Sequence, residues 1–211
     1  MTIETDVRTY RRRLFIDISK RKLRVGTGSS EGFLAKRTTH MIWTDLYPIL
    51  NPLHFAVVGG VATRLYMPER STKDLDVVIA VSDVKQAYAR LKQSGFVLQA
   101  ELGLIQGSTW LSPEGQEIDI LEGHEPWWPQ ALREAQNNHD KQGLPILPLH
   151  YLVLMKYQTG CAQDLADIER MLGQASEKSL LETRNLFGQQ APTDLADLES
   201  LIELGKLSNQ H

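Results

Sequence analysis

Short apolar runs alternate with amphipathic stretches through the middle of the chain. Runs rich in Val, Ile, Leu and Phe that end at turn-forming residues are typical of strands. They predict five strands, at residues 55–58, 75–81, 96–102, 104–111 and 116–121. The Ser-Pro-Glu-Gly sequence that separates the last two of these runs predicts a tight turn between them.

Helical periodicity fills the gaps between the strands and then takes over the end of the chain. It predicts helices at about 39–47, ended by Pro48, at 61–66, and at 83–93, capped by Asp83 and ended by Gly95. From residue 127 onward the pattern is helical, apart from a short strand or extended link at 144–147. Strands interleaved with helices and followed by a helical run predict an α/β or α+β core with a helical tail.

The first 40 residues differ in charge from the rest of the chain. They contain ten Lys or Arg and four Asp or Glu, a net charge of +6, whereas the remainder carries −9. Such a basic segment can bind nucleic acid by releasing phosphate counterions, or it can be a solvated leader with no binding role. We divide the chain into a basic N-terminal arm (1–37), a core (38–147) and a C-terminal helical region (148–211).

The length and composition exclude several classes of protein. A chain of 211 residues is long enough for one domain with an appendage and a substantial core. Its single cysteine, Cys161, cannot form an internal disulfide, which favours a reducing compartment. No apolar run approaches the ~20 residues of a membrane span, and no apolar segment of a secretory signal follows the N-terminal arginines. We expect a soluble, cytoplasmic protein with no membrane partner.

Candidate chemistry begins at the first two predicted strands. Gly59-Gly60 lies between a strand and a helix, where backbone N–H groups can hold an anion, although a tight turn there also favours glycine. Asp74 and Asp76 occupy alternate positions of the next strand, so their side chains project from the same face. Paired carboxylates on an apolar strand suit Mg²⁺, whose usual ligands are one or two carboxylates and substrate phosphates. The alternative is that both acids are solvated at the mouth of the strand.

A further strand repeats this spacing of acids. Glu117 and Asp119 alternate with apolar residues, so Asp119 reaches the same site if this strand pairs near Asp74 and Asp76. Three carboxylates can bind two divalent ions. Glu117 would then be a supporting or a solvated acid. The alternative is an amphipathic edge strand with its acids in water.

Two other motifs have ordinary structural explanations. The sequence of residues 163–169 recurs with small changes at 193–199, which predicts two helix starts with acidic first turns and apolar stripes. Trp127-Trp128 could stack on a base, but the more frequent role of such a pair is to anchor a loop on the core.

Together these features resemble the DNA polymerase β-like nucleotidyltransferase superfamily. The resemblance lies in Val58-Gly59-Gly60, Asp74-Leu75-Asp76-Val77 and Ile118-Asp119-Ile120. The run at residues 70–76 is most similar to minimal nucleotidyltransferases and AbiEii/AbiGii-type toxins, and the sequence at 156–168 is similar to a helical motif of those toxins. The resemblance covers roughly residues 40–172 and implies a nucleotidyltransferase-like α+β fold: a mixed β-sheet flanked by helices, with a C-terminal helical region.

The resemblance also implies roles for the residues of the core. Gly59 and Gly60 would hold the nucleotide phosphates. Asp74, Asp76 and Asp119 would bind two Mg²⁺ ions, and Asp119 would orient or deprotonate the acceptor hydroxyl.

Four further residues are candidate contacts. The resemblance implies that Lys156 would contact the triphosphate and that Asp164 would position Lys156 or the acceptor. Arg64 and Arg70 could neutralise phosphate or could form surface ion pairs.

We therefore expect a Mg²⁺-dependent nucleotidyltransferase that moves an NMP from an NTP to a hydroxyl and releases pyrophosphate. The toxin-like resemblance and the basic arm favour RNA, including tRNA, as the acceptor, with a protein side chain or a small aminoglycoside-like molecule as alternatives. An antitoxin protein is an expected partner. The contrary hypothesis is a catalytically inactive module of the same fold that binds nucleotide, RNA or a partner protein.

Overall fold

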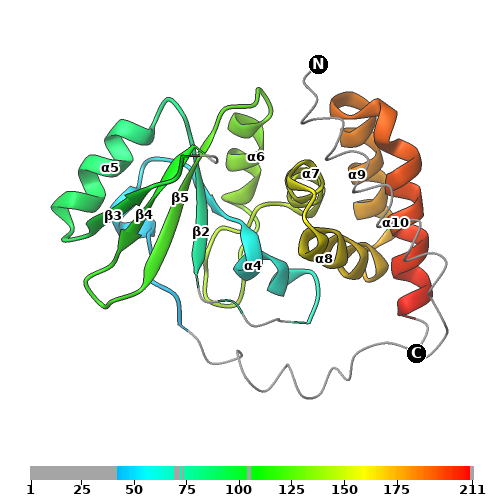
Figure 1. Ribbon diagram of the computed structural model, residues 1–211, viewed down its shortest axis with the longest axis horizontal. Coiled ribbons are helices and arrows are strands. Elements are labelled where there is room, and N and C mark those ends of the chain that lie inside the picture. Colours follow the sequence, from blue (N-terminus) through cyan, green and yellow to red (C-terminus); the bar gives the residue numbers. More distant parts are fainter. Residues whose placement is uncertain (1–41, 69–71, 73, 104–105, 210–211) are drawn as a thin grey trace. The chain divides into compact units, whose positions relative to one another are not determined.

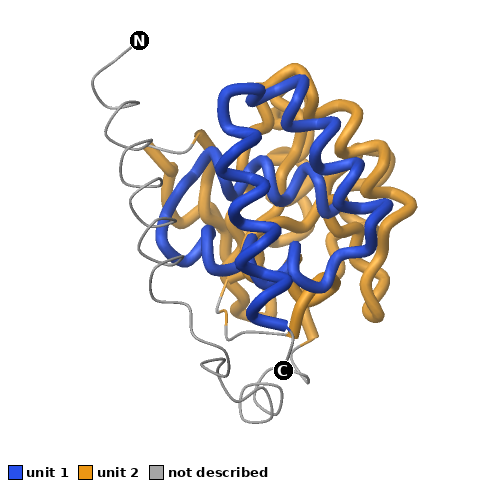
Figure 2. The backbone as a smooth tube through the Cα atoms, turned by 90° about the vertical axis from the view of Figure 1, so that its right-hand side faces the viewer, with its two compact units in different colours: residues 1–30, 149–211 blue, residues 31–148 orange. Residues whose placement is uncertain are grey.

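The computed structural model describes residues 42–68, 72, 74–103 and 106–209. Two compact units divide the described chain, one ending at Pro148 and the other beginning at Leu149, and they are coloured separately in Figure 2. Neither unit contains, within these residues, a helix that is long and apolar enough to cross a membrane.

The first unit is built on a five-stranded mixed sheet. Its strands are β1 (Phe55–Val57), β2 (Leu75–Ala80), β3 (Val97–Glu101), β4 (Gly107–Leu111) and β5 (Glu117–Gly123). The order across the sheet is β1-β2-β5-β4-β3. Among these five described strands, the central pair β2 and β5 is parallel, and the other neighbouring pairs are antiparallel. The fold is therefore α+β, with a mixed sheet as predicted.

Short helices cover the two faces of this sheet. They are α3 (Tyr47–Leu50), α4 (Gly59–Ala62), the 3₁₀ turn η1 (Thr63–Leu65), α5 (Val84–Gln93) and α6 (Trp128–Ala135). In Figure 1, α5 lies on one side of the sheet, and α4 and α6 lie on the other. Alternate β2 residues Leu75, Val77 and Ile79 are fully buried, which explains why this strand is so apolar.

In the residues of the second unit that the structure describes, 149–209, the regular elements are all helices, as the periodicity predicted. They are α7 (Leu149–Thr159), α8 (Ala162–Gly173), α9 (Glu177–Gln190), the 3₁₀ turn η2 (Pro192–Asp194) and α10 (Leu195–Ser208). The two similar sequences noted above lie at the starts of α8 and α10. These helices cross closely at Gly173 and Gly205, where an added Cβ on Gly173 would lie 2.3 Å from the Gly205 carbonyl oxygen.

Two predicted helices of the first unit are wrong in their bounds. Residues 42–46 are not helical, and α3 begins at Tyr47 with Pro48 in its first turn. Proline is favourable there because the N–H that it lacks has no helical partner, so Pro48 starts this helix instead of ending one. The part of the predicted 39–47 helix before residue 42 lies outside the described residues. The helix predicted at 61–66 begins at Gly59 and passes into η1 at Thr63.

The remaining elements differ from prediction by a few residues. The strand predicted at 104–111 is β4, which begins at Gly107. The link at 144–147 is extended and forms a single parallel bridge between Ile146 and Val57 of β1. Trp127 and Trp128 are buried, and the Trp128 indole N–H donates to Glu125, so the pair anchors the start of α6 on the core.

Candidate active site

Asp76 and Asp119 lie side by side on the two central strands. The parallel register pairs Asp76 of β2 with Asp119 of β5. Residues that pair directly on neighbouring strands project from the same face of a sheet. Asp76 lies against Gly59 of α4, so both carboxylates lie on the face that carries α4. Both residues are half-buried. The alternate spacing of acids on the two strands predicts that Asp76 and Asp119 share a face if the strands pair in this register.

A hydroxyl from the next strand holds one of the two carboxylates. Thr109 of β4 pairs with Asp119, and its side-chain Oγ1 donates a hydrogen bond of 2.6 Å to Asp119 Oδ1. One carboxylate oxygen is thereby fixed, which orients the other. Sequence reasoning missed Thr109, although its position in an alternating strand opposite an acid would have singled it out once the strand pairing was known.

The backbone of Gly59 closes the site on the other side of Asp76. Gly59 begins α4 with φ of +61°, and the Val58 N–H donates to the Asp76 carbonyl at 2.9 Å. An added Cβ on Gly59 would lie 1.7 Å from Asp76 Oδ2. Glycine is therefore required at this position both for its backbone angle and to leave room for the Asp76 carboxylate.

Two more acids stand at the outer end of the same strands. Asp74 and Glu117 each precede the first registered pair, Leu75 with Ile118, and both are exposed. Within the part of the chain that the structure describes, no three His, Cys, Asp or Glu side chains are grouped so that they could hold a metal ion. The three-carboxylate centre with Asp74 therefore stays a prediction, whereas the neighbouring pair Asp76 and Asp119 is formed.

Two of the other predicted contacts in this unit, Gly60 and Arg64, lie in the described residues. Gly60 is buried, and its carbonyl accepts a bond of 2.7 Å from Thr63 Oγ1. Arg64 forms an ion pair with Asp140, with Nε donating to Oδ2 at 2.9 Å, so the structure shows the alternative of an ion pair. A phosphate contact by Arg64 would require this pair to open. Arg70 lies outside the described residues.

Lys156 and Asp164 belong to the helical unit. The Lys156 ammonium is buried between two carboxylates, at 2.8 Å from Asp164 Oδ1 and 2.9 Å from Asp167 Oδ2. Asp167, which is fully buried on α8, was not anticipated, although it follows Asp164 by one helical turn. Lys156 therefore forms ion pairs with Asp164 and Asp167 inside the helical unit. Its contact with a triphosphate stays a prediction.

Cys161 lies beside this ion-pair cluster at the start of α8. Its thiol donates to Asp164 Oδ2 at 2.9 Å, and its sulfur accepts from the Asp164 N–H. Partial burial and the hydrogen bond to Asp164 raise the pKa of the Cys161 thiol above its ordinary value. A thiol with a raised pKa is a poor nucleophile at neutral pH, so Cys161 acts here as a helix cap.

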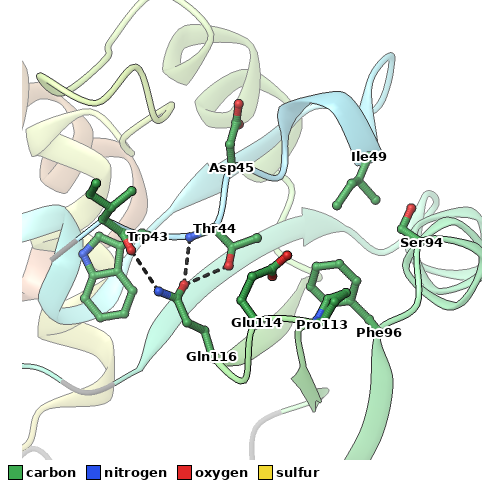
Figure 3. A pocket seen from close by; sticks show the side chains of 10 residues that line it. Trp43, Thr44, Asp45, Ile49, Ser94, Phe96, Pro113, Glu114 and Gln116 are labelled. Carbon is green, nitrogen blue, oxygen red and sulfur yellow. Dashed lines mark hydrogen bonds between the residues drawn. The ribbon is translucent and has the colours of Figure 1, made fainter.

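Two glutamines hold the first described residues at the end of the sheet through hydrogen bonds. Gln116, directly before β5, donates through Nε2 to the Ile42 carbonyl and accepts through Oε1 from the N–H and the hydroxyl of Thr44, and these three bonds are drawn in Figure 3. Gln142 bonds the backbone of Trp43 in the same way, donating to its carbonyl at 2.6 Å and accepting from its N–H at 3.2 Å. The chain therefore enters the fold next to the beginning of β5.

A shallow hollow of about 350 Å³ lies at this entry. It is lined by Ile42, Trp43, Thr44, Asp45, Ile49, Ser94, Phe96, Pro113, Glu114 and Gln116. Asp76 and Asp119 do not line it, so this hollow is distinct from the carboxylate pair.

No protein-family model and no curated protein matches the sequence. Several solved structures align with part of this chain at low identity. The crystal structure of ANT(2'')-Ia in complex with adenylyl-2''-tobramycin is 13% identical over 72% of this chain and 87% of that chain, with a TM-score of 0.37. Terminal uridylyl transferase 4 from Trypanosoma brucei with bound GTP is 14% identical over 60% of this chain and 47% of that chain, with a TM-score of 0.31. The Cid1 poly(U) polymerase is 13% identical over 76% of this chain and 53% of that chain, with a TM-score of 0.35.

Proposed function

We propose that this chain is a nucleotidyltransferase, which moves an NMP from an NTP to a hydroxyl acceptor and releases pyrophosphate. The observation that carries the proposal is the direct pairing of Asp76 with Asp119 on neighbouring parallel strands, with the backbone of Gly59 against the Asp76 carboxylate. The sequence resemblance to polymerase β-like nucleotidyltransferases assigns these same three positions to the reaction centre.

Magnesium fits the donor set of this pair. Two half-buried carboxylates supply the hard oxygen ligands that Mg²⁺ takes together with substrate phosphates and water. Asp76 and Asp119 would hold the ion, with Asp74 as a further ligand from the exposed end of β2. When bound, Mg²⁺ would neutralise charge on the triphosphate.

The protein's own contribution is positioning and proton transfer. Thr109 holds Asp119 Oδ1, which leaves the other oxygen of this carboxylate to accept the proton of the attacking hydroxyl. Asp76 is held against Gly59 and cannot turn towards that side without meeting the backbone. Alignment of the hydroxyl with the α-phosphorus is the larger part of catalysis in phosphoryl transfer.

The proposal also concerns the identity of the acceptor molecule. The toxin-like resemblance favours RNA, with an antitoxin as partner protein. Against a polyanionic acceptor, the strands present three acids, Asp76, Glu117 and Asp119, and no Lys, Arg or His on the face of the candidate site. Backbone phosphates would be repelled by these acids unless cations from elsewhere in the chain neutralised them.

The test is transfer of label from each α-³²P-labelled NTP in the presence of Mg²⁺. The purified chain is incubated alone, with total RNA and with basic protein, and the products are separated on denaturing gels. Asp76→Asn and Asp119→Asn should each lower the rate at least a hundredfold, which corresponds to about 2.7 kcal/mol of barrier.

Glu117→Gln is the matched control, because Glu117 is an exposed acid on the same strand and face as Asp119. It should retain activity within about threefold. Transfer that survives in both Asp variants would contradict the proposed roles. Nucleotide binding without any transfer would instead support the inactive binding module considered from the sequence.

A further inference from the structure

We propose that the acceptor hydroxyl belongs to another protein, and that the segment carrying it docks on an open part of the sheet beside Asp119. This surface, the apolar strip, consists of Val97 and Ala100 of β3 and Leu111 of β4. The inference rests on the proposed function and names the class of acceptor for that same site.

The strand register places the apolar strip on the same face as the carboxylate pair. Thr109 pairs with Asp119, and Leu111 follows Thr109 by two residues, so its side chain shares that face. Val97 pairs with Leu111, and Ala100 pairs with Thr109. A bulge in β3 inserts one extra residue between Val97 and Ala100, so both side chains reach this face although they are three positions apart.

The same strands are covered on one face of the sheet and open on the other. On the side of α5, Trp110 and Ile118 are fully buried, and the Trp110 ring contacts Tyr88 of α5. On the side of the carboxylates, Leu111 is half-buried and Val97 is 56% exposed. There α4 and α6 pack against β1 and β2, and in the part of the chain that the structure describes the apolar strip stays accessible. Contiguous exposed apolar residues mark an interaction surface.

The charge and shape of this surface favour a polypeptide as the acceptor. None of the described strands carries a Lys, Arg or His, so the phosphates of RNA find no cation on them. The apolar strip does not line the hollow at the chain entry, and a small molecule needs a concave site that buries most of its surface. Flat apolar surfaces with a polar rim are typical of protein–protein contacts. The acids of this face favour Lys or Arg in the docked segment.

The spacing of the strands suits an extended segment that lies across them. Asp119, Thr109 and Ala100 form one registered row over β5, β4 and β3. Neighbouring strands lie about 4.8 Å apart, so Ala100 is about 10 Å from Asp119 across the sheet. An extended chain advances about 3.3 Å per residue, so side chains about three residues from the reacting hydroxyl lie over the apolar strip. One segment can therefore fill the strip and present a Ser, Thr or Tyr hydroxyl to Asp119.

The reaction balances with the NTP as the only co-reactant. The hydroxyl oxygen of the docked segment attacks the α-phosphorus, and a phosphoester P–O bond forms. The P–O bond between the α-phosphorus and the bridging oxygen breaks, and pyrophosphate leaves with the electron pair. The hydroxyl proton passes to Asp119 and from there to solvent.

Synthetic peptides are the probes for this acceptor. The first has alternating Val and Lys around a central Thr, the second has Glu in place of Lys, and the third has Ala in place of Thr. With the full chain, Mg²⁺ and each α-³²P-labelled NTP, the Lys peptide should gain label at least tenfold faster than the Glu peptide. The Ala peptide should gain none, and mass spectrometry should place the NMP on the Thr. Binding of the fluorescein-labelled Lys peptide is measured separately by anisotropy without NTP.

Val97→Arg and Ala100→Arg test the docking surface itself. Both side chains are exposed, so the substitutions leave the core intact. Each should weaken peptide binding and raise the KM for the peptide at least tenfold, with the KM for the NTP unchanged. Leu98→Arg is the matched control, because Leu98 lies on the same strand, is 41% exposed and pairs with Trp110 on the opposite face. It should change peptide binding less than about twofold.

Three results would overturn the inference, and they affect the proposed function differently. Label that enters RNA or a small hydroxyl compound while the peptides stay unlabelled refutes a protein acceptor and leaves nucleotidyl transfer standing. Equal weakening by Val97→Arg and Leu98→Arg would mean that only the added charge acts, which refutes docking on the apolar strip. Absence of label on every acceptor, without release of pyrophosphate, removes the proposed function and the acceptor role together, even if the peptide binds.

Discussion

Gly59 and Asp76 are in direct contact, and the contact leaves no space for a side chain on Gly59. Its ideal Cβ would lie 1.7 Å from Asp76 Oδ2 and 2.6 Å from Asp76 Cγ. The glycine that follows the first strand therefore has a role that its sequence context did not show. In addition to any contact with phosphate, it determines where one of the two central carboxylates can lie.

Gly59→Ala should disturb both the fold and the site. A positive φ costs a non-glycine residue about 1–2 kcal/mol, and the clash with Asp76 adds to this cost. We expect the free energy of unfolding to fall by more than 2 kcal/mol in urea denaturation, with transfer activity reduced at least tenfold because the carboxylate is displaced.

Gly115→Ala separates these two effects. Gly115 has φ of +84°, and its added Cβ would meet no atom within 4 Å, so this variant shows the backbone cost alone. Its loss of stability should be smaller than that of Gly59→Ala, and its activity should be normal. Equal losses of stability in the two variants would mean that the contact with Asp76 has no energetic consequence.

Thr109→Val should weaken the positioning of Asp119 without removing a charge. The variant keeps the shape of the side chain and loses the 2.6 Å hydrogen bond to Oδ1. We expect a loss of about 1 kcal/mol in stability and about tenfold in kcat, with little change in KM for the NTP. Thr109→Ser, which keeps the hydroxyl, should restore kcat, and failure of this rescue would contradict the positioning role.

Lys156→Met should destabilise the helical unit strongly. The substitution leaves the buried Asp167 and the half-buried Asp164 without the Lys156 cation, and breaking a buried pair typically costs about 3–5 kcal/mol. Lys178→Met is the control, because Lys178 is 86% exposed and its pair with Glu182 spans 3.9 Å. That change should stay within about 0.5 kcal/mol. A stable Lys156→Met variant that has lost NTP binding would show that Lys156 contacts the nucleotide.

Cys161 should react slowly with thiol reagents at neutral pH. Its raised pKa means that the reactive thiolate forms only at higher pH than in a free cysteine. The rate of alkylation by iodoacetamide, followed from pH 7 to pH 10, should rise with a midpoint above that of the urea-unfolded chain. Asp164→Asn removes the neighbouring negative charge and should move this midpoint downward. A folded-state midpoint at or below the unfolded one would contradict the stated environment.

The sequence predicted the features of the candidate site that depend on local spacing, such as two acids on one face of the sheet. Alternate acids on apolar strands identified Asp76 and Asp119, because a strand has a side-chain period of two. The sequence also predicted the order of strands and helices, because apolar runs indicate strands and glycines indicate turns. The helix bounds near Pro48 were wrong because proline can start a helix as well as stop one.

The rest depends on pairing that no local pattern reveals. The Arg64 ion pair with Asp140 joins residues 76 positions apart, and the Gln116 bonds to Ile42 and Thr44 join residues 74 and 72 apart. The three-dimensional fold determines which distant residues come into contact. From the sequence alone, Arg64 is therefore as well suited to bind a phosphate as to pair with a carboxylate. The same reason hid Thr109, whose importance comes only from its neighbour on β5.

The parallel pairing of β2 with β5 also has a consequence for the order of folding. Asp76 and Asp119 are about forty residues apart, and the chain between them contains α5, β3 and β4. The antiparallel pairs β3 with β4 and β4 with β5 close much shorter loops, so they form at a smaller entropic cost than the central pair. We therefore expect the two carboxylates to meet late in folding, and a chain still being synthesised lacks the candidate site until β5 has been made.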